Sequence, residues 1–303
     1  MLIVGERPGS LLYLRLHTIA RRFSTFQSLL QLDREWFRGR YRERLPSLEP
    51  QLQAVCRALR RNGVVQLPLS DLPVPYEATL RAVDPLQAWL RDQPNDGTED
   101  YYLIPDELLL DSAEPYLFGL SPPLLDLAEV YCGLPVDYLG VNVKREIANG
   151  KDARTRRFHL DPEDYNVLKI IIYLNDVDPL GGPFECLDVE STSKVISTTD
   201  YFLRGSDSNL IRRMVPESRW RTCTGPRLTV NIADTARCLH RAKPPIASDR
   251  YSMTFSYLSR RAYVAFADGK ALQRKFVERF GHLLSERQLS CVSETPRFRW
   301  AFP

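Results

Sequence analysis

The residues of this chain that could carry chemistry begin in the stretch 157–174. It opens Arg-Phe-His-Leu-Asp-Pro, so that one residue separates His159 from Asp161. Side chains of an extended segment alternate between its two sides, and an extended segment here would point both groups the same way. Pro162 cannot donate to a sheet ladder, so we expect it to end the strand and leave Asp161 at the mouth of whatever the sheet encloses. An imidazole and a carboxylate arranged in this way can share one metal ion.

A second imidazole lies 81 residues further on, at His240, in the segment 235–240 that we expect to be a strand. Two neutral imidazoles and one carboxylate make the facial triad that non-haem Fe(II) enzymes use, because three coordination positions remain for substrate and dioxygen. We therefore interpret His159, Asp161 and His240 as candidate metal ligands and catalytic residues. Taken alone, His159 and Asp161 could also be a solvated polar pair at the end of a strand.

Ten residues after His240, the segment Arg-Tyr-Ser-Met-Thr-Phe-Ser-Tyr begins. In a strand, one of its faces carries only charged or hydroxyl groups, namely Arg250, Ser252, Thr254 and Ser256. The guanidinium of Arg250 offers a planar pair of donors that suits a carboxylate, and the hydroxyl of Ser252 adds a third donor. The alternation of side chains along the strand does not say which face points inward. The polar face could therefore bind a carboxylate or could be solvated.

The composition is that of a globular protein with no bulk charge. The 303 residues hold 41 Lys and Arg against 38 Asp and Glu, a formal net charge of +3, which gives no indication of nucleic-acid binding. The six cysteines are far apart and form no Cys-x-x-Cys pair, which favours a reducing compartment over a disulfide framework. The first residues make a poor signal peptide, and no window approaches the run of about 18 apolar residues that a membrane span needs. We expect a cytoplasmic protein without a membrane span, and its oligomeric state stays open.

Periodicity and the placement of Gly and Pro divide the chain into three parts, which we expect to form a single domain. Residues 1–135 have helical periodicity and many prolines, which predicts a mostly helical elaboration. Residues 136–260 contain short candidate strands joined by Gly and Pro turns, at 138–147, 156–160, 167–174, 227–233 and 250–258. Within this part, residues 190–225 form a long insert of the kind that often acts as a lid. Residues 261–303 supply a C-terminal helix and a tail. Short strands at irregular spacing are typical of a β-sandwich or a jelly roll.

One ordered set of groups carries a resemblance to a known family: His159-x-Asp161, then Lys-Ile-Ile-Ile-Tyr-Leu-Asn-Asp-Val-Asp and Gly-Gly-Pro-Phe, then His240, and Arg250 ten residues later. This order resembles the Fe(II)/2-oxoglutarate-dependent dioxygenases, and among them the phytanoyl-CoA dioxygenase-like branch. The resemblance covers roughly residues 136–260, with a weaker similarity over residues 52–67. It breaks down after Pro183, where members often carry Pro-Gly-Ser-His and this chain reads Phe-Glu-Cys-Leu-Asp-Val. The subfamily and the substrate therefore stay open.

The resemblance implies a core that is a double-stranded β-helix of jelly-roll, cupin-like type, mainly β with flanking helices. It implies that His159, Asp161 and His240 bind Fe(II). It also implies that Arg250 pairs with the distal carboxylate of the co-substrate 2-oxoglutarate, with Ser252 as a helper.

Two further residues are candidates for contact with 2-oxoglutarate. Lys169 and Tyr173 share one face of the expected strand 167–174, and either could reach it. By resemblance, the reaction consumes dioxygen (O2), hydroxylates or otherwise oxidises a C–H bond of the substrate, and releases succinate and carbon dioxide (CO2).

The stretch 144–157 holds six cations and two anions directly before His159. We expect it to form a positive rim at the pocket, with Arg154 and Arg156 contacting a small anionic substrate, such as a natural-product or lipid intermediate. A solvated loop is the alternative. Trp220, in the long insert, is expected either to line the pocket or to pack on the barrel.

Two other functions compete with the small-molecule hydroxylase. One is a hydroxylase of protein or peptide side chains, which a wide groove would favour. The other is a cupin-like binding protein without turnover. The sequence argues against a binding protein without turnover, because such a site has no need for the intact set of His159, Asp161, His240 and Arg250.

Overall fold

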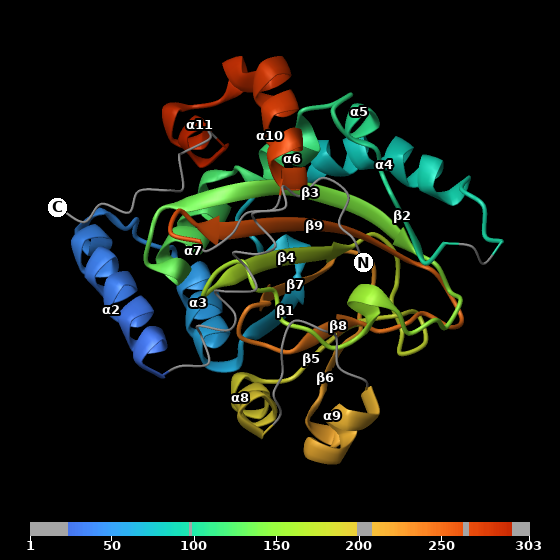
Figure 1. Cartoon of the computed structure of the whole chain (residues 1–303). Helices are drawn as coiled ribbons and strands as arrows, with labels where there is room; N and C mark the ends of the chain where they lie inside the picture. The colour runs from blue at the N-terminus through green and yellow to red at the C-terminus, as the bar shows by residue number, and fades with distance from the viewer. Residues whose placement is uncertain (1–23, 97–98, 199–207, 263–266, 293–303) are drawn as a thin grey trace.

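The structure, a computed structural model, describes residues 24–96, 99–198, 208–262 and 267–292. Two antiparallel sheets lie at its centre (Figure 1). Residues of both sheets line one cavity. Among the described residues, the larger sheet has the strand order β1-β7-β4-β9-β3-β2 and the smaller sheet the order β6-β5-β8. The strands are β1 Val64–Pro68, β2 Tyr101–Leu103, β3 Val136–Glu146, β4 Val167–Tyr173, β5 Phe184–Cys186, β6 Arg221–Cys223, β7 Thr229–Asp234, β8 His240–Ala242 and β9 Arg250–Ser259.

The chain passes back and forth between the two sheets. From β4 in the large sheet it enters β5 and β6 in the small one, returns through β7, crosses again to β8 and ends in β9. The last strand, β9, pairs with both β3 and β4 and so lies between two strands that precede it in the sequence. This alternation is a double-stranded β-helix of jelly-roll type. The predicted jelly-roll core with flanking helices is confirmed, and the described residues have mixed helix and strand content.

The helices are α2 Ser24–Tyr41, α3 Pro50–Asn62, α4 Glu77–Arg91, α5 Asp106–Leu109, α6 Glu114–Gly119, α7 Pro122–Cys132, α8 Val189–Thr198, α9 Ser208–Met214, α10 Ala267–Phe280 and α11 Glu286–Val292. Two of them, α3 and α7, are bounded by clear local signals. Each begins with a proline in its first turn, where the missing N–H costs nothing. Each is followed by a glycine in the left-handed conformation, Gly63 or Gly133, which ends the helix.

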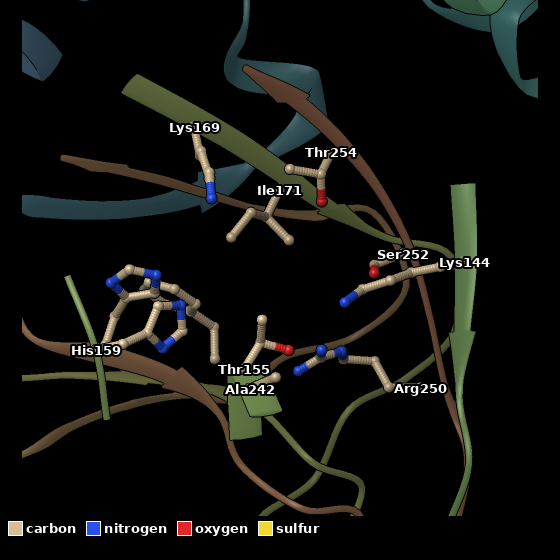
Figure 2. Close-up of a pocket in the computed structure, with 11 residues that line it drawn as sticks. Lys144, Thr155, His159, Lys169, Ile171, Ala242, Arg250, Ser252 and Thr254 are labelled. Carbon is tan, nitrogen blue, oxygen red and sulfur yellow. The ribbon is translucent and has the colours of Figure 1, made fainter. Parts of the chain in front are cut away.

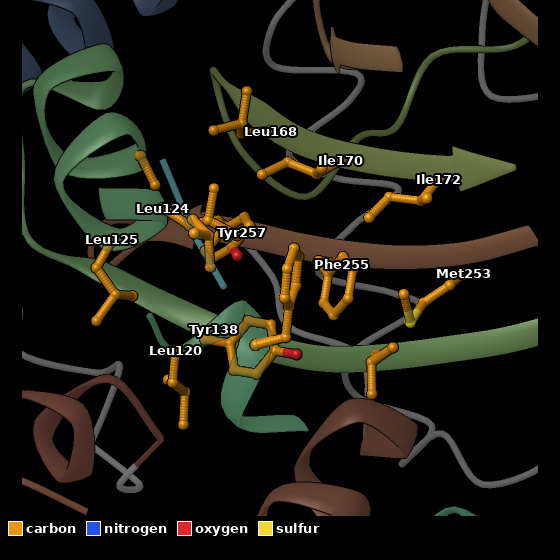
Figure 3. Close-up of a cluster of buried hydrophobic side chains, with 14 of the residues drawn as sticks. Leu120, Leu124, Leu125, Tyr138, Leu168, Ile170, Ile172, Met253, Phe255 and Tyr257 are labelled. Carbon is orange, nitrogen blue, oxygen red and sulfur yellow. The ribbon is translucent and has the colours of Figure 1, made fainter. Parts of the chain in front are cut away.

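The outer face of the large sheet is apolar and carries most of the helices. Figure 3 shows Leu168, Ile170 and Ile172 of β4 beside Met253, Phe255 and Tyr257 of β9, near leucines of α7. These side chains are all at most 1% exposed. Complete burial of one such side chain stabilises a fold by about 1.5–3 kcal/mol. The opposite, inner face of the same strands is largely polar, so that alternation along each strand separates core from cavity.

The outer face of the small sheet is covered by α8 and α9 from the insert (Figure 1). A separate apolar cluster fills this interface: Phe158, Leu187, Val195, Ile211, Val215, Trp220 and Leu239. The insert also contributes β6 to the small sheet, so its last part belongs to the jelly roll itself. No helix in the described ranges is long and apolar enough to cross a membrane.

Several local expectations were wrong. Residues 156–160 are not a named strand, since a 3-10 helix spans Arg154–Arg156 and His159 forms only an isolated bridge to His240. The expected strand 235–240 is a turn for most of its length, and β8 begins only at its end, with His240. The expected C-terminal helix is divided into α10 and α11 by the 3-10 turn Gly281–Leu283.

Candidate functional site

Three side chains from two segments that are distant in sequence converge where the two sheets meet. The potential ligand atoms of His159, Asp161 and His240 all lie within 4.8 Å of one another. The Nε2 atom of each imidazole is 3.8 Å from an oxygen of Asp161. Backbone pairing sets this geometry, because His159 and His240 exchange N–H···O bonds of 2.9 and 3.0 Å, and the N–H of Asp161 donates to the carbonyl of Thr235 at 3.0 Å.

Backbone carbonyls fix which nitrogen of each imidazole is free. The Nδ1 atom of His159 lies 2.8 Å from the carbonyl oxygen of Arg157, and that of His240 lies 3.0 Å from the carbonyl oxygen of Cys238. A carbonyl oxygen can only accept, so each Nδ1 carries the hydrogen in the neutral ring and each Nε2 keeps its lone pair. Both lone-pair nitrogens therefore face the Asp161 carboxylate, the arrangement that a metal-binding histidine needs.

The protonation states suit a metal cation. Burial lowers the pKa of both imidazoles, to about 3 for His240, where the neighbouring His159 adds to the effect. Burial alone would raise the pKa of Asp161, but Lys169 and the two histidines hold it well below its ordinary value. At neutral pH the site thus presents two neutral imidazoles and one carboxylate, and no proton has to leave before a metal binds.

A lysine lies directly beside the Asp161 carboxylate. The Nζ atom of Lys169 is 2.5 Å from Oδ2 of Asp161, and its side chain is 26% exposed to the cavity. Burial alone would lower the pKa of Lys169, but Asp161 and Glu163 raise it above its ordinary value. Lys169 is therefore a charged group of the cavity wall, next to the three candidate ligands.

The two candidates on β4 differ in their surroundings. Lys169 lines the cavity, whereas Tyr173 is fully buried. The hydroxyl of Tyr173 donates to the carbonyl of Cys223 at 2.7 Å and accepts from the N–H of Phe184 at 2.9 Å. Of the two residues, only Lys169 has a polar group directed into the cavity.

The cavity has a volume of about 120 Å³ and extends from the imidazoles to Arg250 (Figure 2). Its lining residues are Lys144, Thr155, His159, Lys169, Ile171, Phe184, His240, Ala242, Arg250, Ser252 and Thr254. The expected polar face of the strand that begins at Arg250 thus points inward. The solvated-face interpretation of that strand is wrong.

The end of the cavity away from the imidazoles is rich in cations. Glu146, only 1% exposed, lies 2.5 Å from Nζ of Lys144, 3.1 Å from Nε of Arg156 and 3.6 Å from a terminal nitrogen of Arg250. Arg250 also donates to the carbonyl of Gly182. Burial alone would raise the pKa of Glu146, but Lys144 and Arg250 lower it to about 2, so its carboxylate is charged.

The three candidates for substrate contact do not line the cavity that the described residues form, and Trp220 instead follows its second alternative, packing on the barrel. Arg156 is 1% exposed and binds Glu146, Asn149 and backbone carbonyls, so it supports the loop from within and offers no charge to a ligand. Arg154 is exposed, with its guanidinium 6.0 Å from the ring centre of Tyr101. Trp220 packs against Phe158 and donates to the carbonyl of Val215, on the outer side of the small sheet.

Sequence reasoning also missed residues that the structure brings into the cavity. Lys144 was expected only as part of a positive rim at the pocket, and Thr155 and Phe184 were not named as site residues. Alternation along β3 could have paired Lys144 with Glu146 on one face. For Thr155, which follows an irregular loop, the sequence holds no comparable signal.

No family model and no curated protein matches the sequence. A search of solved structures finds similar chains. They include the non-heme alpha ketoglutarate dependent epimerase SnoN from nogalamycin biosynthesis (16% identity, 70% of this chain and 84% of that chain, TM-score 0.44). EctD from S. alaskensis, solved with 2-oxoglutarate and 5-hydroxyectoine, is similar at 14% identity over 71% of this chain and 82% of that chain, with a TM-score of 0.48. AviO1 from Streptomyces viridochromogenes Tue57 is similar at 16% identity, with 73% and 100% coverage and a TM-score of 0.46.

Proposed function

We propose that this chain is an Fe(II)/2-oxoglutarate-dependent dioxygenase of the phytanoyl-CoA dioxygenase-like branch. One observation carries the proposal. A single cavity has two bare imidazole nitrogens and a carboxylate at one end and a cluster of buried cations at the other. The first end fits a divalent metal ion, and the second fits the far carboxylate of a 2-oxo diacid.

In this proposal each group of the chain has a defined task. His159, Asp161 and His240 hold Fe(II) from one side and leave its other positions to small molecules. Arg250 and Ser252 bind the distal carboxylate of 2-oxoglutarate, which fixes the direction in which the acid lies. When bound, the iron and the 2-oxo acid supply the oxidising chemistry that uses dioxygen, yields succinate and carbon dioxide and attacks a substrate C–H bond.

The walls of the cavity contribute by excluding water. Ile171 and Phe184 line it, and the aromatic ring of Phe184 lies 5.6 Å from that of His240. A lining that is partly apolar keeps the reacting groups away from bulk solvent, which strengthens every ionic contact inside.

We propose that the whole chain, residues 1–303, is one dioxygenase domain. The support is a continuous apolar core that joins residues of α3 and α7 to strands β3, β4 and β9 and to α10. The role of residues 190–225 as a lid stays a prediction, as does a cytoplasmic location.

We further propose hydroxylation of a small anionic metabolite, such as a natural-product or lipid intermediate. Exposed cations beside the cavity support this, because Arg154 and Arg157 flank Thr155, which lines it.

The test is an anaerobic titration of the metal-free protein with Fe(II) and then 2-oxoglutarate. We expect the weak visible charge-transfer band of the chelate. In Arg250→Met the affinity for 2-oxoglutarate should fall about 100-fold, because a buried charge pair is lost. Arg154→Met, which removes an exposed arginine outside the cavity, is the matched control and should leave the affinity unchanged.

Absence of the band in the wild-type protein would overturn the proposal. Succinate release in air then separates an enzyme from a binding protein without turnover. A panel of carboxylated metabolites and their methyl esters, compared by the succinate release that each stimulates, tests the substrate class. Equal stimulation by acids and esters would rule out the anionic substrate.

A further inference from the structure

We infer that Arg34, on helix α2, is a positioning residue for the segment that carries the metal ligand Asp161. The inference rests on the proposed function, and it assigns a task to a helix that lies outside the jelly roll, at the edge of the molecule (Figure 1). It is carried by the way α2 is attached, by the buried partners of Arg34 and by the contacts that lead from those partners to Asp161.

Helix α2 is attached to the rest of the chain mainly by polar contacts. None of its residues 28–41 belongs to an apolar cluster of the core. Its large apolar side chains Leu29, Leu32 and Trp36 are exposed, whereas Arg34, on the opposite side, is only 5% exposed. Polar contacts are directional and apolar ones are not, so this attachment fixes the position of the groups that Arg34 touches.

The guanidinium of Arg34 binds the segment that follows Asp161. One terminal nitrogen lies 3.1 Å from an oxygen of Asp164, and the other donates to the side-chain oxygen of Asn166 at 2.5 Å. The guanidinium carbon also lies 5.0 Å from the ring centre of Tyr165. Arg34 and Asp164 are 130 residues apart in the chain, and both are buried. One planar group thus contacts three consecutive residues, as the fork of an arginine can.

A short series of buried contacts leads from these residues to Asp161. The side-chain amide of Asn166 donates to Oδ2 of Asp234 at 2.6 Å. Asp234 ends β7 and precedes Thr235, whose carbonyl accepts the N–H of Asp161 at 3.0 Å. The backbone that orients Asp161 is therefore held in place from the side of α2.

Loss of Arg34 would leave a buried carboxylate without its cation. Within the described ranges, Asp164 would then keep the backbone N–H groups of Tyr165 and Ser259 as partners. An uncompensated buried charge is unfavourable, so the segment would shift to bring Asp164 toward water. Bonds to a metal tolerate deviations of only about 0.2 Å, and a displaced Asp161 would bind the ion less well.

The cation-rich end of the cavity is remote from these contacts. Arg250 and Ser252 stand at the start of β9, whereas Asp164 meets that strand at its last residue, Ser259. A defect at Arg34 should therefore weaken metal binding and leave the binding of the distal carboxylate intact.

The experiment measures two affinities under nitrogen. Calorimetric titration gives the dissociation constant of Fe(II), and titration with 2-oxoglutarate at saturating Fe(II) gives that of the co-substrate. In Arg34→Met we expect the first to rise about tenfold, as for other residues that orient a metal ligand, and the second to change less than about 3-fold. Arg40→Met, on the exposed side of the same helix, is the matched control and should change neither.

Two further variants separate positioning from general support of the fold. Arg34→Lys, which keeps a charge beside Asp164, should recover most of the Fe(II) affinity. If Arg34→Met folds poorly, the double variant with Asp164→Asn leaves no uncompensated charge in the interior, and it should show the same loss of Fe(II) affinity. Wild-type Fe(II) affinity in the double variant would overturn the inference.

The outcomes for Arg34→Met itself are equally distinct. An unchanged Fe(II) affinity would overturn the inference, and so would an equal loss of both affinities, which indicates a general structural role. If the wild-type protein binds no Fe(II), the proposed function has failed. That result differs from failure of the inference, in which the wild type binds the ion and Arg34→Met binds it equally well.

Discussion

The two ends of the cavity are built for opposite charges and by different means. At one end, His159 and Asp161 are held by irregular backbone, through an isolated bridge and a contact with a turn, whereas His240 lies on strand β8. At the other end, the cations stand on two long paired strands, β3 and β9. The first end presents lone pairs and a carboxylate, and the second presents an excess of N–H donors. The difference shows how one barrel can fix both the place and the direction of a charged ligand.

The largest effect is expected from removal of the carboxylate at the end of the cavity that holds the imidazoles. In Asp161→Ala we expect Fe(II) affinity to fall more than about 100-fold, since only two neutral ligands remain, and succinate release to be lost with it. Calorimetric titration with Fe(II) under nitrogen measures the affinity. Asp152→Ala, an exposed aspartate outside the cavity, is the control. Metal binding at wild-type strength in Asp161→Ala would mean that the metal lies elsewhere.

A smaller effect is expected from the lysine at the metal end. Lys169 and a metal ion compete for the same carboxylate of Asp161, because the Nζ atom already lies 2.5 Å from Oδ2. A unit charge at about 4 Å is worth several kcal/mol at an effective dielectric constant of about 20, before solvent and relaxation reduce it. We therefore expect Lys169→Met to bind Fe(II) about tenfold more tightly, measured by competition with a chelator.

The matched control for that prediction is Lys144→Met, which removes a cation from the opposite end and should leave Fe(II) affinity unchanged. Weaker Fe(II) binding in Lys169→Met would contradict the competition. It would mean that Lys169 serves mainly to orient Asp161.

The smallest expected effect concerns the pH dependence of stability at the cation-rich end. The pKa of Glu146 falls from 4.5 to about 2 on folding, because Lys144 and Arg250 outweigh the effect of burial. A carboxyl with a lowered folded-state pKa stabilises the fold fully above its unfolded pKa, and this contribution disappears as the pH falls toward 2. Between pH 6 and pH 4 the wild type should thus lose about 1 kcal/mol of its advantage over Glu146→Gln in the free energy of unfolding. Urea unfolding at several pH values measures this, and a constant difference would refute it.

The backbone conformation at the cation-rich end could be predicted from the sequence better than that at the other end. Alternation in the segment 250–256 correctly separated its polar and apolar faces, because β9 is regular. The orientation of Lys144 could not be read by simple counting, since β3 contains a register shift between Tyr138 and Gly140. Gly140, at φ 106°, takes a conformation that other residues avoid. The buried apolar residues stand at even-numbered positions up to Tyr138 and at odd-numbered positions from Val141, so the bulge changes which positions face the core.

The metal end was predictable in its residues and unpredictable in its backbone. The spacing of His159, Asp161 and His240 identified the group that converges, yet the expected strand 235–240 is mostly a turn. An isolated bridge between distant residues leaves no periodic signal in a sequence. Likewise, a run of cations before His159 could not show that Arg156 turns inward to Glu146, because that depends on the loop around it.

The ion pair between Lys169 and Asp161 bears on the order in which folding and metal binding occur. An uncompensated carboxylate inside a barrel would make the empty form costly, and the fold would then depend on its metal, as small zinc domains do. Here the chain supplies its own counter-charge. Folding can therefore be completed first, and loading with iron becomes a separate, later and reversible step.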